Sequence, residues 1–154
     1  MSAVIEGHHD DHHHGPAKGI TRWLFTTNHK DIGSLYLWFS FIMLFIGGAM
    51  AMVIRAELFE PGSQIVSPEF YNQMVTNHGL IMVFGVIMPA FVGFANWLVP
   101  MQIGAPDMAL PRLNNLSFWI LPAAFGVLIS TFLMEGGAPN FGWTFYAPLS
   151  TEYA

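Results

Sequence analysis

The sequence predicts an all-α integral membrane protein with three transmembrane helices. Its 154 residues are 53% hydrophobic and only 10% charged, compared with about 25% charged residues in ordinary soluble domains. Mean hydropathy is +0.47, and three apolar stretches are each long enough to cross a hydrocarbon core of about 30 Å as a helix. Cysteine is absent, which excludes thiol chemistry in this chain, and Lys and Arg total five, so we expect no nucleic-acid surface.

Residues 1–19 form a polar segment that we expect to be a disordered tail. It has no apolar core of the kind found in secretory signal peptides. His-rich tracts also bind metal ions opportunistically, so a metal site is the alternative interpretation of this segment. Its histidines and aspartates are His8, His9, Asp10, Asp11, His12, His13 and His14.

The first transmembrane helix is predicted over about 32–55. The sequence carries no formal charge from Ile32 to Ile54, and a helix of that length spans the hydrocarbon core. Residues 26–31 offer several N-cap candidates, and the amphipathic stretch 20–25 suits the membrane interface. Gly47 and Gly48 permit close packing against another helix.

The second and third transmembrane helices are predicted over about 71–99 and 114–134. Pro89 lies inside the second helix and should kink it, which neighbouring helices can tolerate. Pro122 lies near the start of the third helix. Residues 135–154 are rich in Gly, Pro and aromatic residues, which indicates an interfacial loop rather than another span.

The basic residues favour an orientation with the N-terminus in the cytoplasm. Lys18, Arg22 and Lys30 precede the first helix, and Arg112 lies in the loop 100–113. The other loop has Arg55 together with three glutamates. The positive-inside rule therefore places the N-terminus and the loop 100–113 on the inner side.

Polar residues divide between the two ends of the predicted bundle. His78 opens the second helix and Arg55 closes the first, so both lie toward the outer side. His78 is separated from Asn96 by 18 positions, or about 27 Å of helix, which suits electron arrival at one end and proton uptake at the other. A packing histidine, a snorkelling arginine and capping roles for the inner residues remain open. The inner residues are His29, Asn96, Asp107, Asn114 and Asn115.

Several blocks of sequence resemble subunit I of the haem–copper cytochrome c oxidases. The longest block is IGAPDMALPRLNN at 103–115, and the others are RWLFTTNHKDIG at 22–33, IRAEL at 54–58, NWLVP at 96–100 and GWT at 142–144. The resemblance covers nearly everything after the tail. It implies that the chain corresponds to the first three helices of a twelve-helix bundle.

The resemblance implies a role for several individual residues. His78 is similar to an axial ligand of the low-spin haem, haem a, and Arg55 to the arginine that hydrogen-bonds the formyl group of that haem. Asp107 resembles the entrance carboxylate of the D proton channel. Asn96 and Asn114 resemble the asparagines that order the water chain of that channel.

Three further residues carry weaker or more distant resemblances. Trp143 is similar to the tryptophan near a propionate of the high-spin haem. Glu57 and Gly62 resemble part of a Ca²⁺ or Na⁺ site at the outer surface, where oxygen ligands suit such ions. The segment from Pro89 to Asn96 is one residue shorter than the family pattern, so we expect a local bulge there to be absent or displaced.

The function implied by the resemblance is that of a terminal respiratory oxidase in a bacterial inner membrane. Such an enzyme transfers electrons from cytochrome c to dioxygen, forms water and pumps protons. The implied partners are the remaining helices of subunit I, subunits II and III, cytochrome c and the lipid bilayer. The ligands of the high-spin haem and of copper belong to later helices of the family, so we expect this part alone to be inactive. Two alternatives are a haem-binding electron-transfer module that does not reduce oxygen and a catalytically silent three-helix protein.

Overall fold

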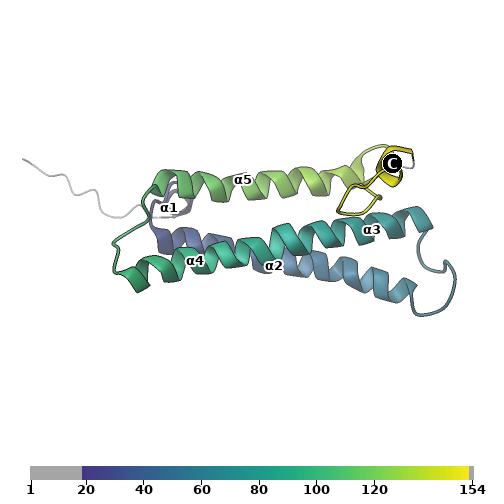
Figure 1. Cartoon of the computed structure of the whole chain (residues 1–154), viewed down its shortest axis with the longest axis horizontal. Helices are drawn as coiled ribbons and strands as arrows, with labels where there is room; N and C mark the ends of the chain where they lie inside the picture. Colours follow the sequence, from purple (N-terminus) through teal and green to yellow (C-terminus); the bar gives the residue numbers. More distant parts are fainter. Residues whose placement is uncertain (1–18, 153–154) are drawn as a thin grey trace, which may run out of the picture.

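The computed structural model describes residues 19–152, and these residues contain three helices long and apolar enough to cross a membrane. They span His29–Glu57, Pro68–Ile103 and Pro111–Leu133. Successive spans run antiparallel along the long axis of the molecule, so the first and third run in the same direction (Figure 1). The predicted all-α membrane architecture with three spans is confirmed. The predicted tail, apart from Gly19, lies outside the described residues.

The first span begins three residues earlier than predicted because Asn28 caps it. Helix α1 (Ile20–Leu24) leads into helix α2 (His29–Glu57), and the Asn28 side chain accepts a hydrogen bond from the backbone N–H of Lys30 at 2.8 Å. Arg22 pairs with Asp31 at 2.7 Å and so ties α1 to the first turn of α2. The hydrogen bond to Asp31 is the main reason that the pKa of the Arg22 guanidinium is raised.

The second span consists of two α-helices joined by a π-helical segment. Helix α3 (Pro68–Leu80) begins after the N-cap Ser67, segment η1 (Ile81–Ile87) is π-helical, and helix α4 (Met88–Ile103) completes the span. The backbone N–H of Met88 donates to the carbonyl of Val83, five residues earlier. Pro89 has no N–H, and its ring crowds the carbonyl four residues before it, so a wider turn ahead of Pro89 relieves that clash.

The π-helical segment lies N-terminal to the stretch from Pro89 to Asn96, the stretch in which we expected a bulge to be absent or displaced. Helix α4 is regular throughout that stretch, and the irregular turn lies N-terminal to it. The expectation that a bulge is absent or displaced there agrees with this arrangement. Gly104 ends α4 in the left-handed conformation, with φ of 71°, which glycine adopts without steric cost.

The third span begins at Pro111 rather than at the asparagines. Helix α5 (Pro111–Ser130) continues into the short helix η2 (Thr131–Leu133), and Pro111 stands in the first turn, where its missing N–H costs nothing. Asn114 and Asn115 therefore lie inside the helix, and the interpretation of them as N-caps is wrong. Beyond α5, residues 135–152 contain only helix α6 (Leu149–Glu152), in agreement with the predicted interfacial loop.

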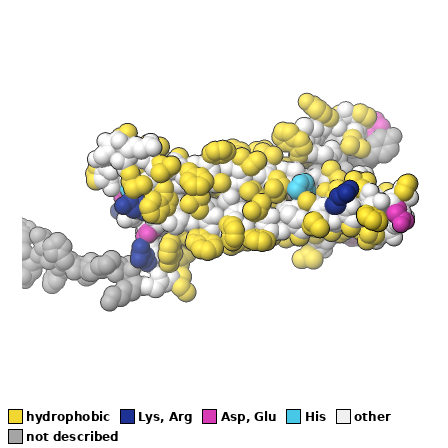
Figure 2. Space-filling view, turned by 90° about the horizontal axis from the view of Figure 1, so that it is seen from below, with side chains coloured by type: hydrophobic (Ala, Val, Ile, Leu, Met, Phe, Trp, Pro, Cys, Tyr) yellow, Lys and Arg dark blue, Asp and Glu magenta, His cyan; other side chains and the backbone are white. Residues whose placement is uncertain are grey.

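The core lies where α2, η1 and α5 meet. Helices α2 and α4 also approach so closely that a Cβ atom on Gly33 would lie 3.0 Å from the carbonyl oxygen of Gly93. Hydrophobic side chains cover much of the surface between the charged ends (Figure 2), as expected for a chain surrounded by lipid or further helices. The buried core residues are Ile32, Tyr36, Phe39, Met43, Ile81, Phe118 and Phe125.

Candidate functional site

The first candidate site is a group of polar residues at the end of the bundle where α2 begins. We call His29, Asn96, Asp107 and Asn114 the Asp107 cluster. The half-buried Asp107 accepts a hydrogen bond at Oδ1 from the backbone N–H of His29 at 3.2 Å and from that of Met108 at 2.8 Å. Its carboxylate thus stands at the N-terminus of α2, where unpaired backbone N–H groups and the helix dipole favour a negative charge.

Two asparagines from different helices complete the Asp107 cluster. Asn114 donates through Nδ2 to Oδ1 of Asn96 at 2.5 Å, and Asn96 donates through its own Nδ2 to the carbonyl of Val92 at 2.9 Å. Nδ1 of the buried His29 donates to the Asn96 carbonyl at 2.8 Å, because a carbonyl oxygen can only accept. The structure therefore brings together the three residues that the sequence predicted for proton uptake, and it adds His29.

A second pair of side chains extends this polar path into the core, and the sequence analysis did not include it. Ser117 donates to the carbonyl of Asn114 at 2.7 Å, and its hydroxyl lies 2.8 Å from that of Tyr36. Hydrogen bonds therefore run continuously from Asp107 to Tyr36, which is 4% exposed. Ser117 could have been found in the sequence, because it lies three residues after Asn114 on the same helix face.

Two buried donors on α5 lack a partner among residues 19–152. They are Nδ2 of Asn115 and Nε1 of Trp119, which lie one turn apart on the helix. Buried donors of this kind are usually satisfied by ordered water. These two donors are therefore suited to binding ordered water molecules.

The second candidate site surrounds His78 at the opposite end of the bundle. His78 is half-buried, and its Nδ1 donates to the backbone carbonyl of Gly47 on α2 at 2.8 Å. Since the carbonyl can only accept, the proton of the neutral imidazole is on Nδ1 and the lone pair is on Nε2. This is the arrangement of a metal-ligating histidine, in which one ring nitrogen is oriented by an acceptor and the other is left for the metal.

Gly47 allows the two helices to approach closely enough for that hydrogen bond. A Cβ atom on Gly47 would lie 2.8 Å from Sδ of Met82 and 3.2 Å from Cγ2 of Ile81. At Gly48, in contrast, nothing lies within 4 Å of an added Cβ atom. The close packing predicted for this glycine pair is therefore a property of Gly47 alone.

The loop after α5 is held against the turn of α3 that precedes His78. Thr76 accepts a hydrogen bond at Oγ1 from the backbone N–H of Gly142 at 2.9 Å. The buried Asn77 donates through Nδ2 to the carbonyl of Pro139 at 3.2 Å. These two bonds connect residues more than 60 positions apart and fix the backbone beside Trp143.

Trp143 lies near His78 in the fold, whereas no hydrogen bond joins Arg55 to His78 in the described part of the chain. The Trp143 side chain is 3.8 Å from the Cβ position of Gly79, the residue after His78, and its ring centroid is 6.4 Å from that of Phe84. Trp143 remains 52% exposed. Arg55 is exposed in the last turn of α2 and has no hydrogen bond or ion pair within the described chain. We call His78, Gly47, Gly79 and Trp143 the His78 site.

Glu57 anchors the loop that follows α2. Its carboxylate accepts hydrogen bonds from the backbone N–H groups of Gln64, Ile65 and Val66 at 2.8, 2.8 and 3.0 Å. Glu57 and Gly62 line one cavity of about 210 Å³. Over residues 19–152, no group of three or more His, Cys, Asp or Glu could hold a metal ion, so a Ca²⁺ or Na⁺ site here would need carbonyl oxygens as further ligands.

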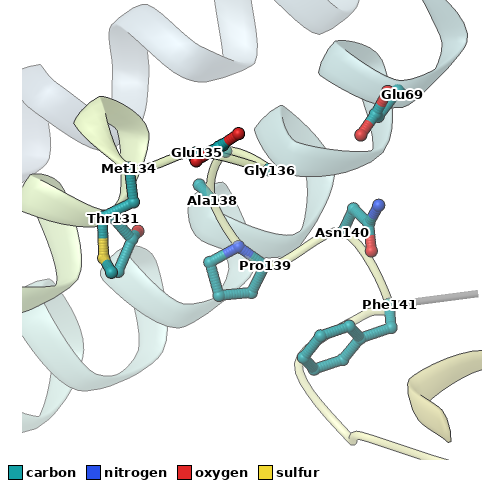
Figure 3. Close-up of a pocket in the computed structure, with 10 residues that line it drawn as sticks. Glu69, Thr131, Met134, Glu135, Gly136, Ala138, Pro139, Asn140 and Phe141 are labelled. Carbon is teal, nitrogen blue, oxygen red and sulfur yellow. The ribbon is translucent and has the colours of Figure 1, made fainter.

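A larger, open cavity lies at the same end of the molecule, between the start of α3 and the loop after α5 (Figure 3). Its volume is about 520 Å³, and its polar side chains include Glu69, Glu135 and Asn140. Pro139, whose carbonyl holds Asn77, lies on its wall. The cavity thus borders the segment that supports Trp143, but no hydrogen bond connects its acidic residues to the His78 site.

Comparison with known proteins shows the family to which this chain is similar. Residues 31–154 match the family described as Cytochrome C and Quinol oxidase polypeptide I. The chain is 52% identical over 137 residues to the probable cytochrome c oxidase subunit 1-alpha of Streptomyces avermitilis, and 49% identical over 138 residues to cytochrome c oxidase subunit 1 of Corynebacterium diphtheriae. Each alignment covers 88% of this chain but only 23% and 24% of the relative, so the chain spans about a quarter of their length.

Proposed function

Because this chain belongs to the Cytochrome C and Quinol oxidase polypeptide I family, we propose that it forms the N-terminal part of the catalytic subunit of a terminal respiratory oxidase. In this proposal the complete subunit transfers electrons from cytochrome c to dioxygen, releases water and pumps protons. Its reaction centre would need a high-spin haem and copper, whose ligands would come from further helices of a twelve-helix bundle. Subunits II and III and the lipid bilayer are its proposed partners.

The observation that carries the proposal is the hydrogen bond from His78 to the carbonyl of Gly47. It orients the imidazole and leaves the Nε2 lone pair for the iron of a low-spin haem a. That haem, when bound, supplies one-electron transfer. Arg55 has no partner within the described chain and would hydrogen-bond the formyl group, where a fixed cation favours the reduced state. Trp143 would lie near a propionate of the high-spin haem.

The Asp107 cluster is the proposed route for proton uptake. The Asp107 carboxylate, half-buried at the N-terminus of α2, would attract protons to the entrance of a water chain. The amide groups of Asn96 and Asn114 do not themselves carry protons. They would hold water molecules in line by donating and accepting hydrogen bonds, and the hydroxyls of Tyr36 and Ser117 would extend the line into the core.

The positive-inside rule supports an orientation for this mechanism. The protein would lie in a bacterial inner membrane with its N-terminus in the cytoplasm. The Asp107 cluster would then face the cytoplasm, and the His78 site would face the outer side, where cytochrome c delivers electrons. Glu57 and Gly62 would contribute to a Ca²⁺ or Na⁺ site on that outer side.

The proposal is tested by His78→Ala in the complete subunit, assembled with its partner subunits. We expect the low-spin haem signal to disappear from the reduced-minus-oxidised spectrum, because the other histidine among residues 19–152, His29, lies at the opposite end of the bundle. The spectrum also distinguishes the non-oxidase alternative, since haem a absorbs further to the red than haem b. A mutant that retains the wild-type low-spin signal would contradict the assignment of His78.

A further inference from the structure

An apolar groove runs along the outside of the bundle between α2 and α4. It has a volume of about 390 Å³ and is lined by Ser34, Leu37, Trp38, Phe41 and Trp97. Trp38 is 64% exposed and Phe41 is 50% exposed, although both are large apolar side chains. The groove belongs to neither the Asp107 cluster nor the His78 site.

Among residues 19–152, the cation at one end of this groove is Lys30. The Lys30 ammonium lies 6.0 Å from the centroid of the Trp97 ring, a cation–π distance. Lys30 makes no ion pair within residues 19–152, because the neighbouring carboxylate of Asp31 is bound by Arg22. The rim of the groove therefore carries an uncompensated positive charge.

The polar side-chain atoms of Trp97 and Ser34 in the groove already make hydrogen bonds to groups of this chain. Nε1 of Trp97 donates to Oγ of Ser34 at 3.2 Å, and Ser34 in turn donates to the Lys30 carbonyl at 2.8 Å. The surface beyond Ser34 is therefore aromatic and aliphatic. Its ligand needs an anionic group at the Lys30 end and an apolar body along the rest.

The length of the groove along α2 suits an acyl chain of a lipid. Lys30 is the second residue of α2, and Phe41 follows it by eleven residues, or about 16 Å of helix. The groove thus begins near the membrane interface and reaches about halfway across a hydrocarbon core of about 30 Å. The exposed apolar face of α2 continues beyond the groove to Phe45 and Met52, so the charge at the Lys30 end, rather than the apolar length, distinguishes a phospholipid from a packed helix.

We propose that this groove binds one anionic phospholipid, with its phosphate at Lys30 and one acyl chain against Trp38, Phe41 and Trp97. Basic residues near the membrane surface attract anionic headgroups, and interfacial tryptophans anchor the adjacent chain. This inference goes beyond the proposed oxidase function and does not depend on haem binding.

The test measures lipid retention by the complete, purified protein. Delipidated protein in detergent is incubated with phosphatidylglycerol or phosphatidylcholine, and the bound lipid per chain is determined by native mass spectrometry. We expect one retained phosphatidylglycerol and weaker binding of phosphatidylcholine. Lys30→Gln should weaken phosphatidylglycerol binding about fivefold, the effect of about one lysine near an anionic surface, and Lys30→Arg should preserve it.

Two matched variants separate this site from general surface effects. Arg112→Gln removes another exposed cation at the same end of the bundle but outside the groove, and it should leave retention unchanged. Phe41→Ala should weaken the binding of both lipids, whereas Met52→Ala, about three turns further along α2 and outside the groove, should not.

Three results would overturn the inference. Equal retention of the two lipids by the wild type would remove the role of the headgroup charge. Equal losses in Lys30→Gln and Arg112→Gln would indicate nonspecific attraction to the surface. Absence of retained lipid, with a photo-crosslinker at position 41 reacting with protein, would show that another helix or subunit covers the groove.

Discussion

The Asp107 cluster and the His78 site differ in how much of each is built by this part of the chain. Every side chain of the Asp107 cluster has a hydrogen-bond partner within the described residues, supplied by α2, α4, α5 and the loop between α4 and α5. At the other end, His78 has an unused ring nitrogen, Arg55 has no partner and Trp143 is half exposed. Within residues 19–152, the Asp107 cluster is internally hydrogen-bonded, whereas the groups of the His78 site are open to further contacts.

The proposed function gives this difference a physical reason, because the Asp107 cluster would hold water molecules and protons and the His78 site would hold a haem. Water molecules and protons are small, so the ends of three helices are enough to enclose the outer part of a path for them. A haem is much larger than the space between two helices in contact. The His78 site therefore presents an oriented ligand on an open face, and we expect variants at the two sites to separate proton uptake from haem binding.

The largest effect outside haem ligation should come from Asp107→Asn in the complete enzyme. Asparagine can still accept from the backbone N–H of His29, so loss of stability should be about 1 kcal/mol or less, and haem content should be retained. We expect turnover to fall severely and pumping to stop, while the early rate of haem reduction is unchanged. Oxygen consumption and haem reduction are measured on one preparation.

Asp31→Asn is the matched control for Asp107→Asn. Asp31 lies in the first turn of α2, the turn that Asp107 contacts. The Asp31 carboxylate, however, accepts hydrogen bonds from Arg22 and Thr26 and is not part of the Asp107 cluster. Its replacement should leave turnover near normal. Equal losses of turnover in the two variants would mean that any charge removed from this end inhibits the enzyme.

Asn114→Leu should have the next largest effect. It should act on the same site by removing a hydrogen bond to Asn96. The change removes the donor that pairs with Oδ1 of the buried Asn96, and an unpaired buried acceptor costs about 1–3 kcal/mol. Asn115→Leu is the adjacent control, because its Nδ2 makes no hydrogen bond to another group of residues 19–152. Thermal unfolding should show the larger loss for Asn114, and steady-state turnover should fall with it.

Gly47→Ala should disturb the His78 site and leave the Asp107 cluster intact. The added methyl would overlap Met82 and press on Ile81, at a cost of about 1 kcal/mol if the flexible Met82 side chain moves aside. Any separation of α2 from α3 weakens the bond to His78, which should shift the reduction potential of the low-spin haem.

The same glycine pair supplies the control for this prediction. Gly48→Ala meets nothing within 4 Å and should leave the haem potential unchanged, with a small gain in helix stability. Met82→Ala combined with Gly47→Ala should restore the wild-type potential. A potential unchanged in Gly47→Ala would show that the Gly47 carbonyl keeps its place despite the methyl group.

The smallest effect is expected for Arg22→Gln, which breaks the ion pair between α1 and α2. The Arg22 guanidinium is exposed where it pairs with Asp31, and such surface bridges contribute little to stability and are screened by salt. The difference in unfolding temperature between Arg22→Gln and the wild type should shrink at high salt. Neither proton uptake nor haem binding should change.

The locations of the three spans could be predicted from the sequence because apolar length is a local property. The polar residues at the span ends could be found in the same way, since His78, Asp107 and Asn114 interrupt or border uncharged stretches. The predicted helix starts lie about three residues after the starts seen in the structure. The signals were present in the chain, however, because Asn28 and Pro111 stand at those starts.

The partners of those polar residues were decided only by the tertiary structure. The acceptor for His78 is a backbone carbonyl 31 residues away, and the donor to Asp107 is a backbone N–H 78 residues away. Backbone groups are the same at every position, so no residue type identifies which one a side chain will meet. Their choice depends on how the helices are rotated against one another, and for α2 and the second span that packing includes the close contacts at Gly33, Gly47 and Gly93.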